Sequence, residues 1–227
     1  MQINFYNPRV KVLWATPSPT EVVTRACSIT QRGVFADEAE PNAALMKFLY
    51  HAEHGSPLEH AVICMDITQI SRACADQLRT HRMASHTMSS THYQDHRNYC
   101  HRVEFTSAGV SFNAIVEGIE VTMAGYERTI DSGTPKEAAR QCLPLSIEVR
   151  HMLTINARSL ANFIRLRSCY RNTMEMVLLA ERMQAAAYSW FPELFGHVMK
   201  PCDYDGCREG KMRCDKKAFE ERKVYYG

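Results

Sequence analysis

The sequence predicts a fold that combines a β-sheet with several long helices. Three short segments, at residues 3–14, 61–67 and 146–155, carry the alternating or continuous apolar residues that are typical of strands. Other segments carry apolar residues at three- and four-residue spacing, which is typical of helices that pack on a core. No internal repeat or low-complexity linker divides the chain. We therefore expect a single domain, residues 1–227, whose C-terminal part, residues 198–227, is a cysteine-containing tail.

The N-terminal half is predicted from its apolar patterns and its helix-start residues. Val10, Val12 and Trp14 alternate with other residues and indicate the first strand. Pro41 is a favourable residue at the start of a helix, and Ala61–Ile67 is largely apolar, as in a strand at the centre of a sheet. In chain order we expect a strand at 3–14, helices at 20–30 and 41–54, a strand at 61–67 and a helix at 71–79.

The C-terminal half begins with a segment, 94–112, that is expected to be irregular. Further on, Thr134, Pro135 and Glu137 form the pattern of a helix start, with Thr as the cap, Pro at the first position and Glu at the third. In chain order we expect helices at 114–130 and from 134, a strand at 146–155, and helices at 156–167 and 173–191.

Composition argues against several classes of protein. A formal net charge of +2 over 227 residues does not suit a protein that coats nucleic acid. No stretch approaches the roughly 20 apolar residues of a membrane span, and the N-terminus lacks the charged start and apolar core of a signal peptide. The nine cysteines are scattered and odd in number, which fits free thiols in a reducing compartment. We therefore expect a cytoplasmic protein with neither nucleic acid nor membrane as a partner.

Common catalytic and metal-binding motifs do not occur in the sequence. It contains no G-x-x-x-x-G-K-[ST], no G-x-G-x-x-G and no G-x-S-x-G. Cys202, Cys207 and Cys214 lack the paired spacing of a structural zinc site, and the histidines of residues 81–101 match no ligand signature, so no metal is expected. No single cysteine stands out as a nucleophile.

Residues 77–93 form the most unusual stretch of the chain. Imidazole, guanidinium and hydroxyl groups follow one another without an apolar period, a composition that suits a phosphate-bearing ligand. The alternative interpretation is a solvated loop after a helix. Similar donors occur at 55–60, at Arg140 and at 156–167, each beside an expected strand or helix end. Together the four segments suggest a composite site for a large anion.

The helix expected at 156–167 presents two polar faces. At about 100° per residue, Arg158, Asn162 and Arg165 share one face. Arg167 lies roughly 180° around the helix from Arg158, so a straight helix cannot point both arginines into one pocket. Either the helix ends between them, or the two faces serve different sites, as an oligomer permits.

The stretch from Thr80 to Tyr93 reads T-H-R-M-A-S-H-T-M-S-S-T-H-Y and resembles the signature R-H-R-x-x-S-x-N-x-x-S-x-R-Y of the flavin-dependent thymidylate synthases. Three further segments resemble motifs of the same family in the same order. They are Ser56–His60 (S-P-L-E-H, family [ST]-P-x-E-H), Ala139–Pro144 (A-R-Q-C-L-P, family A-R-x-x-L-P) and Asn156–Arg167 (N-A-R-S-L-A-N-F-I-R-L-R, family N-x-R-S-L-x-N-F-x-x-L-R). The chain is therefore identified as a divergent member of that family.

The resemblance implies an α+β fold with a mixed sheet and long helices, assembled as a homotetramer whose active sites lie between subunits. It also implies reductive methylation of dUMP to dTMP. Methylenetetrahydrofolate would supply the carbon, FAD would carry the hydride and NADPH would reduce the flavin, with no cysteine nucleophile. Sites between subunits would let the opposite faces of the 156–167 helix serve different parts of one site.

Position by position, the resemblance implies roles for individual residues. Those implied to hold FAD, with Glu59 as support for its turn, are Ser56, Glu59, His81, Arg82, Asn156, Arg158 and Asn162. Those implied to line the dUMP site are Gln77, Arg79, Ser90, His92, Arg140 and Arg167. Arg140 would pair with the phosphate, with Ser90 as a further donor. Arg167 would be the catalytic residue, stabilising negative charge on the uracil ring.

The signature region also departs from the family pattern. Thr80 and His92 stand in place of arginines, and Thr87 stands in place of an asparagine. Met88 occupies a position where members often carry a glutamate, and Arg171 one where many carry a histidine. Two alternatives therefore stay open. One is a paralogue that makes another 5-substituted pyrimidine nucleotide, such as 5-hydroxymethyl-dUMP or a dCMP derivative; the other is a nucleotide-binding protein without turnover.

Overall fold

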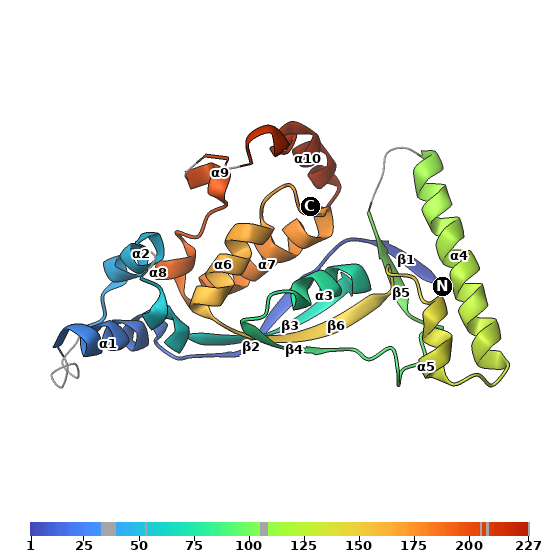
Figure 1. The fold of residues 1–227 in the computed structure, drawn as a ribbon, viewed down its shortest axis with the longest axis horizontal. Coiled ribbons are helices and arrows are strands. Elements are labelled where there is room, and N and C mark those ends of the chain that lie inside the picture. Colours follow the sequence, from blue (N-terminus) through green and yellow to red (C-terminus); the bar gives the residue numbers. More distant parts are fainter. Residues whose placement is uncertain (33–39, 53, 105–108, 205, 208, 227) are drawn as a thin grey trace.

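The chain has an α+β architecture (Figure 1). The computed structural model describes all residues except 33–39, 53, 105–108, 205, 208 and 227. The described strands are β1 (Gln2–Phe5), β2 (Arg9–Ala15), β3 (Val62–Ser71), β4 (Ala84–Met88), β5 (Cys100–Val103) and β6 (Glu148–Asn156). An antiparallel sheet has the order β2-β3-β6-β4, and a separate parallel pair joins β1 to β5. Parallel and antiparallel pairing both occur, but in separate sheets, whereas the resemblance implies one mixed sheet.

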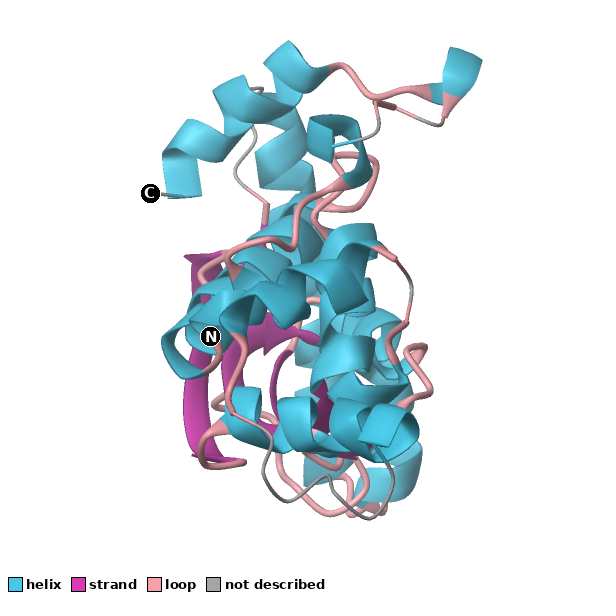
Figure 2. Ribbon diagram, turned by 90° about the vertical axis from the view of Figure 1, so that its left-hand side faces the viewer, coloured by secondary structure: helices cyan, strands magenta, loops and turns pink. Residues whose placement is uncertain are grey.

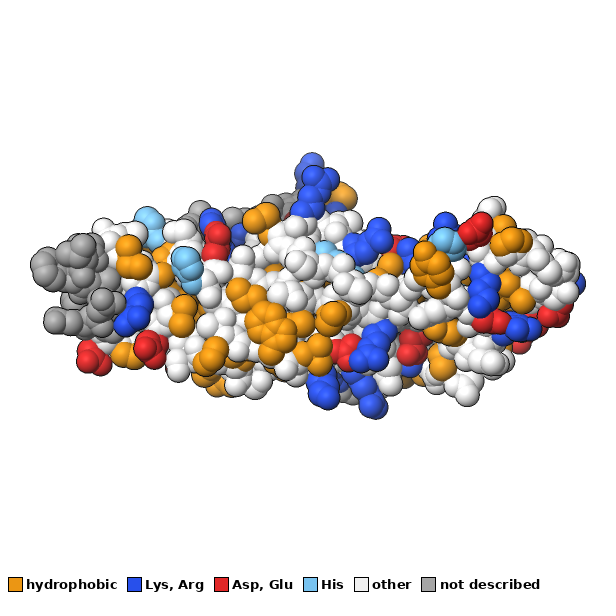
Figure 3. Space-filling view, turned by 90° about the horizontal axis from the view of Figure 1, so that it is seen from below, with side chains coloured by type: hydrophobic (Ala, Val, Ile, Leu, Met, Phe, Trp, Pro, Cys, Tyr) orange, Lys and Arg blue, Asp and Glu red, His pale blue; other side chains and the backbone are white. Residues whose placement is uncertain are grey.

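The four-stranded sheet buries one face and leaves the other open. On β6, Val149, Leu153 and Ile155 are buried, whereas Arg150 and Met152 between them are exposed, because side chains alternate along a strand. Helices lie on the buried face only (Figure 1). Seen from below, hydrophobic side chains gather near the middle of the open side, beside a group of Lys and Arg (Figure 3).

Trp14 belongs to this open face. It pairs with Cys64 across the β2–β3 register, and Cys64 alternates with Ile63 and Met65, which face the core. The Trp14 side chain is 52% exposed. A large aromatic residue and Met152 therefore remain accessible on a face that no helix of the described chain covers in Figure 1.

Three helices cover the buried face: α3 (Arg72–Arg79), α6 (Ala157–Arg167) and α7 (Met174–Trp190) (Figures 1 and 2). Their apolar sides join the strands in the main core, which includes Met65, Phe163 and Leu179, all with at most 1% exposure. Glu175 of α7 links two of these helices, since its carboxylate accepts from the Ser71 backbone N–H at 2.6 Å and from the Ser71 hydroxyl at 2.5 Å. Ser71 in turn caps α3.

The remaining helices gather at the two ends of the sheet (Figure 1). At one end lie α1 (Pro19–Arg32), α2 (Ala43–His51), the 3-10 helix η2 (Ser56–His60) and α8 (Pro192–Phe195). At the other end lie α4 (Gly109–Asp131), α5 (Lys136–Ala139) and the 3-10 helix η3 (Arg140–Cys142). In the described parts of the chain, no helix combines the length and hydropathy that crossing a membrane would require.

The C-terminal tail contains α9 (Pro201–Tyr204) and α10 (Lys216–Lys223) and lies on the side of α7 away from the sheet (Figures 1 and 2). Phe219 of α10 is buried and stacks on Tyr170 with ring centroids 4.3 Å apart. The Lys200 ammonium sits 3.8 Å from the centroid of the same Tyr170 ring, and Arg171 forms an ion pair with Glu209. The tail is therefore fastened to the loop between α6 and α7.

Several predicted elements need correction. The strand predicted at 3–14 is two strands in two sheets, because Pro8 lies between β1 and β2 and lacks the N–H that a continuous ladder needs. The irregular segment 94–112 contains β5, and the polar stretch 77–93 contains β4. Thr134 does not cap α5, whose N-cap position is Pro135 without a side-chain hydrogen bond. The other predicted helices and strands are confirmed, but α4 begins at Gly109, five residues before its predicted start and inside the predicted irregular segment, and β3 continues to Ser71.

Candidate functional site

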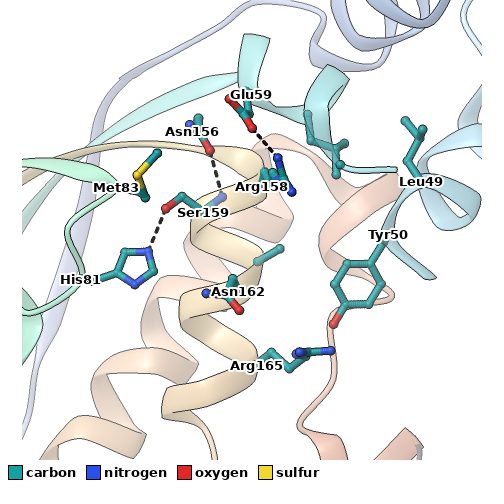
Figure 4. A pocket seen from close by; sticks show the side chains of 13 residues that line it. Leu49, Tyr50, Glu59, His81, Met83, Asn156, Arg158, Ser159, Asn162 and Arg165 are labelled. Atoms are coloured by element: carbon teal, nitrogen blue, oxygen red, sulfur yellow. Dashed lines mark hydrogen bonds and ion pairs between the residues drawn. The ribbon is translucent and has the colours of Figure 1, made fainter. Parts of the chain in front are cut away.

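A cavity of about 400 Å³ lies where β6 runs into α6, beside η2 and the end of α2 (Figure 4). Its walls combine apolar groups with several hydrogen-bond donors, a lining typical of small-molecule sites. The lining residues are Leu49, Tyr50, Gly55, Leu58, Glu59, His81, Met83, Asn156, Arg158, Ser159, Ala161, Asn162 and Arg165.

The start of α6 sets the polar wall of this cavity. Asn156 ends β6 and caps α6, with its Oδ1 accepting from the Ser159 backbone N–H at 2.8 Å. Arg158, Asn162 and Arg165 then project into the cavity from successive turns of the helix (Figure 4). The shared face predicted from helical geometry is therefore confirmed.

A second wall is the single turn of η2 together with Gly55 before it. Arg158 Nη1 donates to Glu59 Oε1 at 2.6 Å, which ties this turn to α6. The Arg158 side chain passes close over Gly55, where an added Cβ would lie 2.9 Å from Arg158 Nε. A side chain at position 55 would push the arginine aside, so glycine permits this close approach.

His81 reaches the cavity from the end of α3. Its Nε2 lies 2.8 Å from the Ser159 hydroxyl, and its ring meets Phe163 edge-on. Burial lowers the pKa of His81, against a hydrogen bond with Ser159 that raises it, and the positive charge of Arg167 lowers it further. The imidazole is therefore neutral near neutral pH and can accept or donate one hydrogen bond at Nε2.

His86 and His151 form a hydrogen-bonded pair next to His81. His86 Nε2 lies 2.9 Å from the His81 carbonyl oxygen, which can only accept, so this nitrogen carries the proton. His86 Nδ1 lies at hydrogen-bond distance from His151 Nε2, 3.0 Å away. Burial lowers the pKa of His151 to about 4, and the positive charge of Arg79 acts in the same direction. The two rings are thus joined by hydrogen bonds to the backbone of His81, which lines the cavity.

Arg167 points away from the cavity, as its place on the helix requires. Its Nη2 donates to the Thr80 hydroxyl at 3.1 Å and its Nη1 donates to Asn172 Oδ1 at 3.3 Å. Gln77 and Arg79 belong to the same last turn of α3, and Arg79 faces Asp76 at 3.9 Å. The structure therefore places Gln77, Arg79 and Arg167 in one region, separate from the cavity lining.

A third group of predicted residues lies beside α5, at the other end of β6. His92 Nε2 is 2.6 Å from Glu137 Oε2, and Arg140 Nε donates to the Glu137 carbonyl oxygen at 3.1 Å. Ser90 Oγ accepts from the His92 backbone N–H at 3.1 Å. Lys136 adds another cation, because its Nζ donates to the backbone carbonyl of Tyr93 at 3.3 Å. Ser90, His92 and Arg140 thus come together around Glu137, beside Lys136.

Five of the residues predicted to hold a cofactor line the cavity: Glu59, His81, Asn156, Arg158 and Asn162. Ser56 and Arg82 do not line it, although each is the chain neighbour of a lining residue. Sequence reasoning assigned no role to the other lining residues, which are Leu49, Tyr50, Gly55, Leu58, Met83, Ser159, Ala161 and Arg165. Arg165 was predicted to share the face of Arg158, and this shared face could have placed Arg165 among the predicted cofactor-binding residues. Tyr50 gave no signal, because its position depends on how α2 packs.

Comparison with known proteins agrees with these motifs. Residues 11–193 match the family described as "Thymidylate synthase complementing protein". A flavin-dependent thymidylate synthase of Geobacter sulfurreducens is 30% identical over 94% of this chain and 97% of its own length, and one of Clostridium tetani is 29% identical over 96% of each. A UMP/dUMP methylase PolB of Streptomyces cacaoi has a similar fold, with a TM-score of 0.77, 22% identity, and coverage of 87% of this chain and 96% of that one.

Proposed function

The chain belongs to the thymidylate synthase complementing protein family, and on this premise we propose that it is a flavin-dependent thymidylate synthase that methylates dUMP to dTMP. The observation that carries the proposal is the cavity at the start of α6. Residues from two separate family motifs, Glu59 and Arg158, form an ion pair across it at 2.6 Å. Methylenetetrahydrofolate would supply the carbon and NADPH the reducing equivalents.

The residues of the cavity fit one part of FAD. Arg158 and Arg165 offer guanidinium donors for a diphosphate, and Asn162 lies between them on α6. Leu49 and Leu58 offer apolar contact for a flat ring system, and a cavity of about 400 Å³ is in the size range of small-molecule sites. When bound, the flavin supplies the redox chemistry, and the protein supplies binding and orientation. Ser56 and Arg82 would contribute from the rim.

The cluster beside α5 fits the phosphate of the nucleotide. Arg140, His92 and Ser90 offer three kinds of donor within one cluster, and a guanidinium binds phosphate through a bidentate pair. Arg167 would face the pyrimidine ring, where its charge stabilises negative charge that develops during reaction. Gln77 and Arg79 would line the same part of the nucleotide site.

Assembly as a homotetramer would bring these separate regions into one site. In a single chain the cavity lies at the end of β6 and the Arg140 cluster beside its start, at opposite ends of the sheet (Figure 1). The open face of the sheet supports assembly, because hydrophobic side chains gather near its middle (Figure 3) and such patches mark interaction surfaces. Trp14 and Met152 are exposed on the same face. A neighbouring subunit on this face would cover them.

One preparation tests the proposed function. The purified protein is examined for a flavin absorption spectrum, then given dUMP or dCMP with methylenetetrahydrofolate and NADPH, and the product is identified by mass. Formation of dTMP supports the proposal. A product heavier than dTMP by one oxygen would indicate a 5-hydroxymethyl product instead. A protein that neither contains nor binds FAD would contradict the proposal, and a nucleotide-binding protein without turnover would bind dUMP but leave it unchanged.

Arg165→Ala is expected to weaken FAD binding. Arg165 lines the cavity, and loss of one charge-assisted hydrogen bond costs about 1.5–3 kcal/mol, or roughly a 10- to 150-fold increase in Kd. Titration of the apoprotein with FAD, followed by flavin fluorescence, measures this. The control is Arg182→Ala, which removes an exposed arginine from α7 outside the cavity and should leave Kd unchanged. Equal affinities for the two variants would exclude Arg165 from the flavin site.

A further inference from the structure

Arg167 is held by two uncharged acceptors, the Thr80 hydroxyl at 3.1 Å and Asn172 Oδ1 at 3.3 Å. The ion pairs of the described residues do not include Arg167, whereas several other arginines each face a carboxylate. Its guanidinium is therefore oriented by hydrogen bonds without being neutralised. The positive charge of Arg167 also acts on His81: burial has the largest lowering effect on the pKa of His81, and Arg167 lowers it further.

The orientation of Asn172 is fixed by its remaining hydrogen bonds. Its Nδ2 donates to the carbonyl oxygens of Leu166 at 3.0 Å and of Cys169 at 2.9 Å. An amide nitrogen has two protons, and both are used here, so only the amide oxygen can face Arg167. The loop between α6 and α7 thus presents a fixed acceptor to the last residue of α6.

Thr80 is fixed in a comparable way. Its hydroxyl donates its single proton to the Gln77 carbonyl oxygen at 2.7 Å. The lone pairs of that hydroxyl therefore remain to accept from Arg167. The family signature has an arginine at position 80. A guanidinium there could not accept a hydrogen bond from Arg167, and its positive charge would repel that of Arg167.

We propose that Thr80 and Asn172 are positioning residues that aim Arg167 at the nucleotide base while preserving its full positive charge. This inference rests on the proposed function, in which that charge stabilises an anionic pyrimidine ring. A carboxylate in place of either acceptor would orient the guanidinium through a stronger bond but would cancel the charge that the ring needs. Uncharged acceptors provide orientation without that cancellation.

A set of Thr80 variants tests the need for an uncharged acceptor. Thr80→Val removes the acceptor with little change in shape, Thr80→Ser keeps it, and Thr80→Asp replaces it with a charged one. In the flavin-loaded protein, we expect Thr80→Val to raise the Kd for dUMP by about 3- to 10-fold, the effect of one neutral hydrogen bond, and Thr80→Ser to restore it. Thr80→Asp should bind dUMP more weakly than Thr80→Val. Wild-type affinity in Thr80→Asp would overturn the inference.

A double-mutant cycle tests whether Asn172 acts through Arg167. Calorimetry gives the Kd for dUMP of wild type, Asn172→Ala, Arg167→Ala and the double variant. We expect Asn172→Ala to weaken binding by about 3- to 10-fold in the wild type and to have no further effect once Arg167 is absent. Additive losses would mean that Asn172 has an independent structural role and would overturn the inference. Asn113→Ala, an exposed change on α4, is the control.

Wild-type protein separates failure of this inference from failure of the proposed function. If it binds neither dUMP nor UMP, the proposed function fails and the inference fails with it. If it binds and converts dUMP while the Thr80 and Asn172 variants retain wild-type affinity, only the inference fails. Urea midpoints of all variants confirm that each compared protein is folded.

Discussion

Arg167→Ala should almost abolish turnover of dUMP while leaving the visible spectrum of bound flavin intact. The guanidinium lies on the face of α6 opposite the cavity, so its removal spares the cofactor-binding side chains. Loss of one preorganised donor to a developing negative charge lowers kcat by about 100- to 1,000-fold. Steady-state kinetics with dUMP and the absorption spectrum of the same preparation measure the two effects.

Arg182→Ala is the matched control, because it removes one positive charge from the exposed side of α7. Its kcat should equal that of the wild type. If Arg167→Ala turned over dUMP as fast as this control, the catalytic role of Arg167 would be wrong. If instead Arg167→Ala lost its flavin, the assignment of the two faces of α6 to different ligands would be wrong.

Glu175→Gln should remove a large pH dependence from the stability of the fold. Burial raises the pKa of Glu175 to about 7, although the hydrogen bonds from Ser71 and the charge of Arg102 act in the opposite direction. The folded protein therefore holds a proton that the unfolded chain releases near pH 4.5. The stability that this proton provides is fully present below pH 4.5 and is lost as pH rises through about 7.

The size of this effect follows from the two pKa values. One pH unit of difference corresponds to about 1.4 kcal/mol, so between pH 5 and pH 8 the wild type should lose about 2–3 kcal/mol relative to Glu175→Gln. Glutamine keeps an acceptor for the Ser71 N–H without the charge. Urea unfolding of both proteins across this range gives the difference, and Glu221→Gln, on the exposed side of α10, is the control. Parallel pH profiles for wild type and Glu175→Gln would contradict the prediction.

The pH dependence of wild type must be compared with that of Glu175→Gln, because buried histidines change the stability of the fold with pH in the opposite direction. Burial lowers the pKa of His101 and of His151 to about 4. Their contribution to stability is present above pH 6.5 and is lost as pH falls through about 4. Both histidines are present in wild type and in Glu175→Gln, so their effects cancel in the difference between the two curves.

The helices that line the cavity could be predicted, because the residue patterns that indicate them lie within each helix. The period of α6 places Arg158 and Arg165 on one face and Arg167 on the other, and neither result depends on distant parts of the chain. The resemblance to a family assigned Glu59 and Arg158 to one site, but it did not predict their ion pair, since the two residues lie far apart in the sequence.

Two strands escaped prediction because pairing, not composition, makes them strands. β4 contains Ser85, His86 and Thr87, with little to bury, and forms an edge strand because β6 offers it a hydrogen-bonding partner. β5 pairs with β1 from the far N-terminus. Asn172 was not predicted as a partner of Arg167, because its orientation depends on the carbonyl groups of the turn between α6 and α7.

The open face of the four-stranded sheet has an optical consequence. The chain has two tryptophans. Trp14 is 52% exposed on this face, whereas Trp190 is partly buried and its indole N–H donates to the Thr16 carbonyl oxygen at 2.8 Å. Intrinsic fluorescence therefore contains one emitter on the open face and one in the packing of α7 against the sheet. A subunit that covers this face shields Trp14 from a soluble quencher and leaves Trp190 unaffected. Assembly and unfolding thus give separate fluorescence signals in one sample.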